Sequence, residues 1–95
     1  MAAYVVVDVE IHDPVRYEEY RKTVLPTLQA YGGRFLARGG KVEVLEGSWS
    51  PKRLVILEFP DAVTAKKWWS SAECANPKAV RQSASDTDML IVEGI

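Results

Sequence analysis

Residues 4–11 carry the clearest hydrophobic pattern of the chain. Every odd-numbered position from Val5 to Ile11 is apolar, whereas the even-numbered positions mix apolar residues with Asp8 and Glu10. An alternation with a period of two is typical of a β-strand. We therefore predict a strand with one dry face, which helices cover, and a second face that is less dry.

A helical pattern follows between Asp13 and the glycine pair 32–33. Asp13 is a good N-cap, and the proline after it suits the first helical position. Apolar and aromatic residues then recur at spacings of three and four, which predicts an amphipathic helix that the two glycines end. Pro26 lies inside this helix and removes one backbone hydrogen bond, so we expect a bend there.

The remaining segments alternate between strand-like and helix-like patterns. We expect strands at 34–38, 42–46, 53–59 and 88–93, a helix that Asp61 caps and that continues to Trp69, and a short helix at 77–83. The glycine pair 39–40 predicts a hairpin between the first two of these strands, and Asn76-Pro77 indicates a break before the short helix. If the hairpin counts as one arm, the order is β-α-β-β-α-β, so we predict a single α+β, ferredoxin-like domain over residues 1–95.

Charge and composition exclude several classes of protein. The chain has 95 residues, with 12 Lys and Arg against 13 Asp and Glu, and so lacks the basic excess of a typical nucleic-acid binder. No apolar run approaches the length of a membrane span, so we expect no membrane partner. A single cysteine and the absence of a leader-like N-terminus favour a cytoplasmic location. A domain this short often gains stability by forming oligomers.

Several short motifs recur in an order that resembles a known family. They are Asp13-Pro14, Gly32-Gly33-Arg34-Phe35-Leu36, Arg38-Gly39-Gly40, Glu46-Gly47-Ser48-Trp49, Glu58-Phe59-Pro60, Trp68, Ser71, Arg81 and Val92-Glu93-Gly94. From about Tyr4 to Gly94 the chain resembles the domain of unknown function 1330 family of small, mostly bacterial proteins.

The resemblance implies an architecture and an assembly, but no settled activity. Members look like dimeric α/β barrels, in which the helix-free face of one sheet packs against the sheet of the partner, so a homodimer is expected. Related barrels include quinol-type monooxygenases, haem-degrading enzymes and muconolactone isomerases. Members often have an aromatic residue after Ser-x-Glu, where this chain has Cys74. If that aromatic lines a pocket, the pocket here is smaller or differently shaped.

Charged residues on the less dry face are candidates for chemistry. Asp8 and Glu10 lie on it, Glu58 has the matching parity on the central strand, and Arg38 and Arg53 are the nearest opposite charges. Charges that enter a partly dry dimer interior need partners. Two alternatives follow, a small-molecule pocket built from carboxylates and guanidinium groups, or an ionic network that fixes the register of the dimer.

Histidine and tryptophan offer further candidates. His12 is the only histidine and lies at a strand end, where it could act as a catalytic general base or be an exposed turn residue. Trp68 and Trp69 point about 100° apart on a helix, so they cannot both face one core. Trp49 lies in a loop and is expected at a pocket edge or an interface, with core or rim packing as the alternative.

Arg81 is a candidate for binding an anion together with Ser71 and Ser85, because guanidinium and hydroxyl donors suit carboxylates. A solvated helix face explains these residues equally well. Tyr20 could present its hydroxyl to a cavity, although its spacing is that of a core residue. One histidine and one cysteine give no metal-ligand spacing, and no phosphate-binding loop is present, so we expect neither metal nor cofactor.

These observations lead to two hypotheses. The first is a small-molecule binding protein or cofactor-independent enzyme, monooxygenase-like or isomerase-like, with a cavity between sheet and helices. Its site residues would be His12 as a catalytic group and Tyr20, Arg38, Trp49, Arg53, Trp68, Ser71 and Arg81 as ligand-binding groups. The second is a non-catalytic dimeric binding or structural module. A closed cavity of about 300 Å³ or more would favour the first hypothesis.

Overall fold

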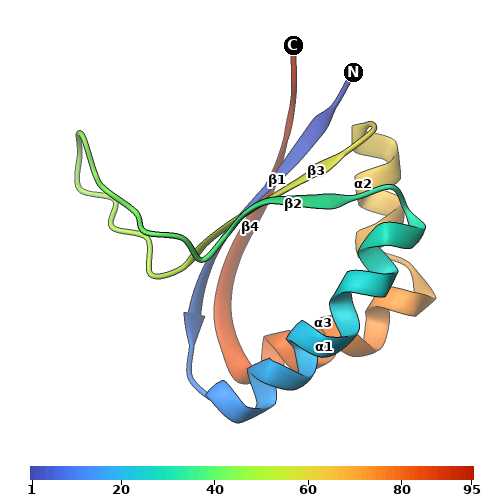
Figure 1. The fold of residues 1–95 in the computed structure, drawn as a ribbon, viewed down its shortest axis with the longest axis horizontal. Coiled ribbons are helices and arrows are strands. Elements are labelled where there is room, and N and C mark those ends of the chain that lie inside the picture. Colours follow the sequence, from blue (N-terminus) through green and yellow to red (C-terminus); the bar gives the residue numbers. More distant parts are fainter.

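Four strands form one antiparallel sheet in the order β2-β3-β1-β4, and three helices cover one of its faces (Figure 1). The computed structural model describes all residues, 1–95. The elements are β1 (Ala3–Ile11), α1 (Pro14–Ala30), β2 (Arg34–Arg38), β3 (Leu54–Phe59), α2 (Ala62–Trp69), α3 (Ala72–Ala84) and β4 (Ser85–Glu93). The predicted α+β, ferredoxin-like fold is confirmed.

The dry face of β1 forms the centre of the core. Val5, Val7 and Val9 are buried under the helices, and β1 pairs with β3 on one side and with β4 on the other. Leu57 and Phe59 extend the same apolar layer on β3. Burying each of these side chains contributes on the order of 1.5–3 kcal/mol, so the alternation in the sequence decides which face the helices cover.

The helix α1 starts where its capping residues predict. The Asp13 carboxylate accepts a hydrogen bond from the backbone N–H of Arg16 at 3.1 Å, and the helix continues without interruption through Pro26. Its end approaches β3 closely at Gly33. A Cβ atom there would lie 2.6 Å from Leu28 and 2.7 Å from Phe59, so only glycine allows this packing.

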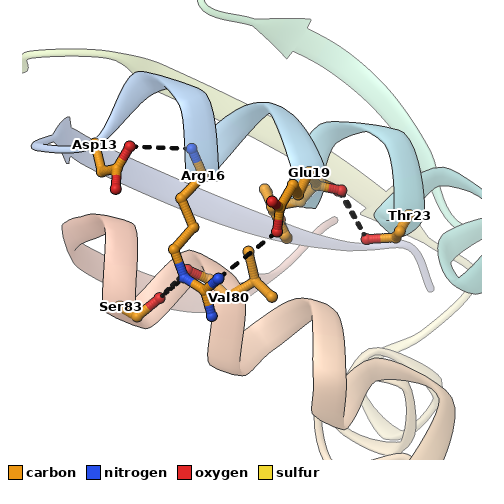
Figure 2. A network of polar contacts seen from close by, with 7 residues as sticks. Asp13, Arg16, Glu19, Thr23, Val80 and Ser83 are labelled. Carbon is orange, nitrogen blue, oxygen red and sulfur yellow. Dashed lines mark hydrogen bonds and ion pairs between the residues drawn. The ribbon is translucent and has the colours of Figure 1, made fainter.

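A polar network joins α1 to α3 on the outer surface (Figure 2). Arg16 donates from Nε to the Ser83 hydroxyl at 2.6 Å and lies 3.6 Å from the Glu19 carboxylate. The Ser83 hydroxyl in turn donates to the carbonyl of Val80. Exposed ion pairs contribute little stability, so this network mainly fixes how the two helices lie against each other.

The predicted strand at 42–46 is wrong. Residues 39–53 form a long loop that projects from the sheet on the side away from the helices (Figure 1). A strand needs a hydrogen-bonded neighbour, and residues 42–46 form no ladder with any other segment of the chain. Its apolar side chains are consequently exposed, including Val44 and Leu45.

The short helix expected at 77–83 starts earlier, at Ala72. The Ser71 hydroxyl caps it by accepting a hydrogen bond from the backbone N–H of Cys74 at 3.1 Å. Pro77 lies inside the helix and is itself buried. The packing of this face offsets the hydrogen bond that proline removes, so Asn76-Pro77 does not end the helix.

The strand β2 contains an irregularity that matters for the site. Phe35 pairs with Leu57 and Arg38 pairs with Val55, whereas Leu36 between them has no partner across the ladder. This β-bulge adds one residue and shifts the alternation. Phe35 and Arg38 therefore both point to the face that the helices cover.

No helix of the structure combines the length and the apolar character that crossing a membrane requires.

Candidate functional site

A small cavity lies between the sheet and the helices. Its volume is about 20 Å³, which is room for about one water. Fifteen residues line it, and 11 of them are hydrophobic. They come from all four strands or their ends and from all three helices, so the cavity is a feature of the whole fold.

The other four lining residues are all arginines: Arg21, Arg38, Arg53 and Arg81. No carboxylate lines the cavity. Arg21 forms an ion pair with Glu18 at 3.3 Å, but the remaining three arginines take part in none of the four ion pairs of the chain. The cavity therefore combines apolar walls with uncompensated positive charge.

Each of these three guanidinium groups lies over an aromatic ring instead. The distance from the guanidinium carbon to the ring centroid is 4.4 Å for Arg38 over Phe35, 6.0 Å for Arg53 over Tyr17, and 5.9 Å for Arg81 over Tyr20. Such cation–π contacts contribute about 0.5–2 kcal/mol each. They attract a cation but do not neutralise it.

Gly39 makes the position of Arg53 possible. The backbone at Gly39 has a φ of +69°, and a Cβ atom there would collide with the Arg53 guanidinium group. The Nε atom of Arg53 is buried and has no hydrogen-bond partner. A buried donor without a partner costs about 1–3 kcal/mol, so this one has capacity for an acceptor.

Arg81 is the most deeply buried of the four arginines, with only 5% of its surface exposed. It extends from α3 and borders two spaces. One is the inner cavity, and the other is a polar groove of about 430 Å³ that Asp8, Glu10, Asp86 and Asp88 also line. No other residue lines both, so Arg81 separates the apolar cavity from the polar outer surface.

Tyr20 also faces the cavity, and its ring lies 5.3 Å from that of Tyr17. Burial disfavours the phenolate and raises the pKa of Tyr20 to about 12, although the charges of Arg81 and Arg38 oppose this shift. The hydroxyl is consequently neutral near pH 7 and can donate a hydrogen bond into the cavity.

Trp68 forms the wall on the side of α2. It is buried, its ring lies 5.3 Å from that of Phe59, and its indole N–H donates to the Thr27 hydroxyl at 3.1 Å. Trp69 points outwards and is exposed, as the angle between adjacent helical residues predicts. The structure thus brings five predicted ligand-binding residues around one cavity. They are Tyr20, Arg38, Arg53, Trp68 and Arg81.

Three predicted residues lie elsewhere. His12 is exposed at the end of β1, where its Nε2 lies 2.7 Å from the Asp86 carboxylate, and this hydrogen bond raises the pKa of His12. Trp49 lies in the 39–53 loop and donates to Asp8 at 3.2 Å. The Ser71 hydroxyl caps α3 and donates to the carbonyl of Trp68 at 2.7 Å, so the backbone occupies it.

The expected grouping of carboxylates with Arg38 and Arg53 is wrong. Asp8 points away from the helices and accepts hydrogen bonds from Trp49 and from the backbone N–H of Lys52 at 3.0 Å. Arg38 lies on the opposite face because of the bulge in β2, and Arg53 has the parity of Val55. The sheet therefore separates the acidic groups from these arginines.

Sequence reasoning missed Arg21. It follows Tyr17 by four residues on α1, and residues at this spacing share one face of a helix. Since Tyr17 is a core residue, the spacing places Arg21 at the edge of the core. No group of three or more His, Cys, Asp or Glu side chains is arranged to hold a metal ion.

Comparison with protein families gives a match along nearly the entire chain. A family described as a domain of unknown function, DUF1330, matches residues 2–95. The chain belongs to the DUF1330 family. The resemblance inferred from the sequence motifs is confirmed, whereas no functionally curated protein matches the chain.

Solved structures share the fold of this DUF1330 protein. A protein of unknown function from Rhodopseudomonas palustris has a TM-score of 0.80 at 16% identity and covers 99% of this chain and 82% of its own. A dimeric ferredoxin-like protein of unknown function from Jannaschia sp. has a TM-score of 0.72 at 12% identity, with 99% and 100% coverage. SnoaB, a cofactor-independent oxygenase from Streptomyces nogalater, has a TM-score of 0.67 at 9% identity, with 99% and 93% coverage. At these identities the similarity establishes the fold.

Proposed function

We propose that this DUF1330 protein is a homodimer that binds a small organic molecule in the cavity between its sheet and its helices. The observation that carries the proposal is the composition of the cavity wall, in which 11 hydrophobic residues surround four arginines. Arg81 is buried and Arg53 is half-buried, and a wall that serves only as a core has no need for cationic groups in such positions, since they are costly without partners. Apolar walls with a few convergent polar groups are typical of ligand sites.

The helix-free face of the sheet supports the dimer. Leu90 and Val92 are 57% and 49% exposed there, and they pair across the ladder with Val6 and Tyr4 on β1. An apolar strip of this kind is a typical surface for association. The dimeric relative from Jannaschia sp. has the same fold, which further supports this assembly.

Ligand entry requires side chains to move, because the cavity holds only about one water in this structure. Arg38 and Arg81 are well suited to such movement. Both have long side chains, and their guanidinium groups lie over aromatic rings without forming an ion pair. Rotamer changes of this kind are common when a protein binds a partner.

The groups around the cavity limit the chemistry that we propose. Guanidinium groups and the neutral Tyr20 hydroxyl donate hydrogen bonds, whereas no carboxylate or histidine lines the cavity to act as a general base. The cavity is therefore suited to binding an anion or stabilising one that forms during a reaction. SnoaB supports the view that this fold can act without a cofactor.

A non-catalytic dimeric module is the second candidate, and the size of the cavity favours it. A volume of about 20 Å³ is well below the roughly 300 Å³ of a ligand pocket. In that case the arginines would contribute only their packing against the rings.

Native mass spectrometry of gently purified protein tests the proposal. We expect a species of about 21 kDa, twice the 10.6 kDa of the chain, with extra mass that is lost on harsher activation. A bare dimer whose melting temperature no small organic molecule raises would favour the structural module. A monomer of 10.6 kDa would contradict the homodimer.

A further inference from the structure

The three unpaired arginines point to the chemical class of the ligand. An arginine cannot escape the cost of burial by losing its proton, because the guanidinium group stays protonated in proteins. A buried guanidinium group is therefore normally paired with a carboxylate or another acceptor. Here the buried Arg81 and the half-buried Arg53 line one cavity without a carboxylate in its wall, and the exposed Arg38 lies at the same cavity. Inside the cavity the three guanidinium groups lie over aromatic rings, and only the outer side of Arg81 borders the acidic groove.

The positive charges also repel one another. Arg81 is 5% exposed and Arg53 has a buried Nε without a partner, so solvent does not fully screen them. One bound negative charge would relieve the repulsion and give the Nε of Arg53 its missing acceptor. The complement of this wall is consequently an anion.

We propose that the ligand is an organic monoanion, an apolar body carrying one carboxylate, whose carboxylate accepts hydrogen bonds from Arg38, Arg53, Arg81 and the Tyr20 hydroxyl. This inference rests on the proposed binding function of the cavity. Guanidinium groups suit a carboxylate because they offer parallel pairs of N–H donors. The apolar body would lie against the valine and leucine side chains of β1, β3 and α1 and against Trp68.

The rest of the wall distinguishes a carboxylate from a phosphate. No lysine lines the cavity, and 11 of its 15 lining residues are hydrophobic. Phosphate sites more often use backbone N–H groups at a helix N-terminus together with lysine. A strongly hydrated dianion would lose its water against these apolar side chains, whereas an apolar carboxylate would bury its body favourably.

Trp68 provides a direct readout of binding. The chain has three tryptophans, and replacing Trp49 and Trp69 by phenylalanine leaves Trp68 as the only one. In this background the fluorescence of Trp68 is titrated with benzoate and hexanoate, with their neutral amides benzamide and hexanamide, and with inorganic phosphate. We expect each carboxylate to bind at least about tenfold more tightly than its amide, and phosphate to bind more weakly than either carboxylate.

Substitutions at the arginines test whether Arg53 and Arg81 cause the preference for a carboxylate over its amide. Arg81→Met and Arg53→Met each remove a charge at similar volume, and we expect each to raise the Kd of benzoate by about tenfold or more. Benzamide binding should change by less than about twofold. Arg81→Lys keeps the charge but loses the paired donors, so its affinity should be intermediate. Arg16→Met, on the outer surface of α1, is the matched control and should bind like the parent.

Circular dichroism and the melting temperature show whether each variant is folded. If Arg81→Met does not fold, Arg81→Lys still tests the role of Arg81. Equal affinity for benzoate and benzamide, or equal affinity for benzoate and phosphate, would overturn the inference while leaving a binding site in place. Unchanged benzoate affinity in folded Arg81→Met and Arg53→Met would do the same. If neither acids nor amides change Trp68 fluorescence or the melting temperature up to about 10 mM, the proposed binding function itself fails.

Discussion

Gly39 and Arg53 form a pair in which the backbone makes room for a charge. The φ of +69° at Gly39 favours glycine on conformational grounds, and the guanidinium group of Arg53 occupies the space that a Cβ atom would need. Gly47 provides a natural comparison within the same loop. Its φ is +87°, but nothing lies within 4 Å of the Cβ position.

Alanine substitutions separate these two effects. Both Gly39→Ala and Gly47→Ala should lower the free energy of unfolding by about 1–2 kcal/mol, because each places a non-glycine residue at positive φ. Only Gly39→Ala should also displace Arg53 and weaken benzoate binding, by about tenfold. Denaturant unfolding and Trp68 fluorescence measure the two quantities. Equal benzoate affinity of both variants would show that the position of Arg53 does not affect benzoate binding.

His12 and Asp86 make a second residue-scale feature, in which a hydrogen bond links the end of β1 to the start of β4. The hydrogen bond to Asp86, followed by its negative charge, raises the pKa of His12 above 6.5. Because the folded pKa is the higher one, protonated His12 stabilises the fold below about pH 6.5, and this contribution is lost as the pH rises through the folded value.

An NMR titration checks this, since His12 is the only histidine of the chain. The pKa of His12 should be raised in the parent and return towards about 6.5 in Asp86→Asn. In Asp88→Asn, the control, it should stay raised, because Asp88 does not contact the ring. The difference in unfolding free energy between the parent and His12→Gln should also shrink between about pH 5.5 and about pH 9. A His12 pKa that Asp86→Asn leaves unchanged would contradict the assignment.

At the scale of whole elements, the sequence predicts what the local pattern determines. The alternation in β1 and the Asp13 cap of α1 give both elements nearly their observed bounds. The strand expected at 42–46 is wrong because pairing is a property of two segments, and no strand of the chain pairs with residues 42–46. The break expected at Asn76-Pro77 is wrong for a similar reason, since the packing that keeps α3 intact around Pro77 comes from other elements.

The candidate site, too, can be predicted from the sequence only where the local pattern determines it. Helical spacing indicates that Tyr20 and Trp68 can face one interior, but the position of Arg38 depends on the bulge at Leu36. No residue of β2 marks the bulge in advance, because Arg34–Arg38 contains no glycine or proline. Strict alternation would place Arg38 on the helix-free face together with Asp8, and the bulge is the reason that it lies on the opposite face.

One hydrogen bond ties α2 to α1 inside the core. The indole N–H of Trp68 donates to the Thr27 hydroxyl at 3.1 Å, and that hydroxyl donates to the carbonyl of Val24 at 2.7 Å. Trp68 is only 2% exposed, so its N–H has no access to bulk water as an alternative partner. The loss of the acceptor would leave a buried donor unsatisfied.

Thr27→Val should therefore lower the free energy of unfolding by about 1–3 kcal/mol. Thr23→Val is the matched control, since Thr23 lies one turn earlier on α1 and donates only to carbonyls of its own helix. Its effect should stay within about 0.5 kcal/mol. Urea unfolding of the three proteins gives both values, and similar losses at both positions would mean that the indole hydrogen bond contributes nothing specific.

At the scale of the molecule, the helix-free face divides into two halves. Near the chain ends it is apolar, with Val6 opposite Leu90 on the neighbouring strand. Towards the other end it is acidic. There Asp8 lies opposite Asp88, and Glu10 lies opposite Asp86, an arrangement that destabilises a sheet because like charges face each other. The apolar half therefore offers the favourable surface for a second subunit.

Leu90→Glu tests this assignment. We expect it to raise the dissociation constant of the proposed homodimer by more than about tenfold, because it places a charge in the apolar half. Val63→Glu is the control, since Val63 is 62% exposed on α2 and Leu90 is 57% exposed. Sedimentation equilibrium measures the self-association of both variants. A dimer that withstands Leu90→Glu but not Val63→Glu would place the interface on the helical side.

The bulge in β2 also affects how this protein aligns with its evolutionary relatives. In this chain the residue that pairs with Val55 comes three positions after Phe35. In a relative without the bulge, the equivalent residue comes only two positions after the equivalent of Phe35. If that relative has an arginine at the equivalent place in its cavity, an ungapped alignment puts this arginine opposite Ala37. Arg38 then wrongly counts as a position that is not arginine in the relative. Counting substitutions column by column would therefore underestimate how widely the positive charge of this cavity has been inherited.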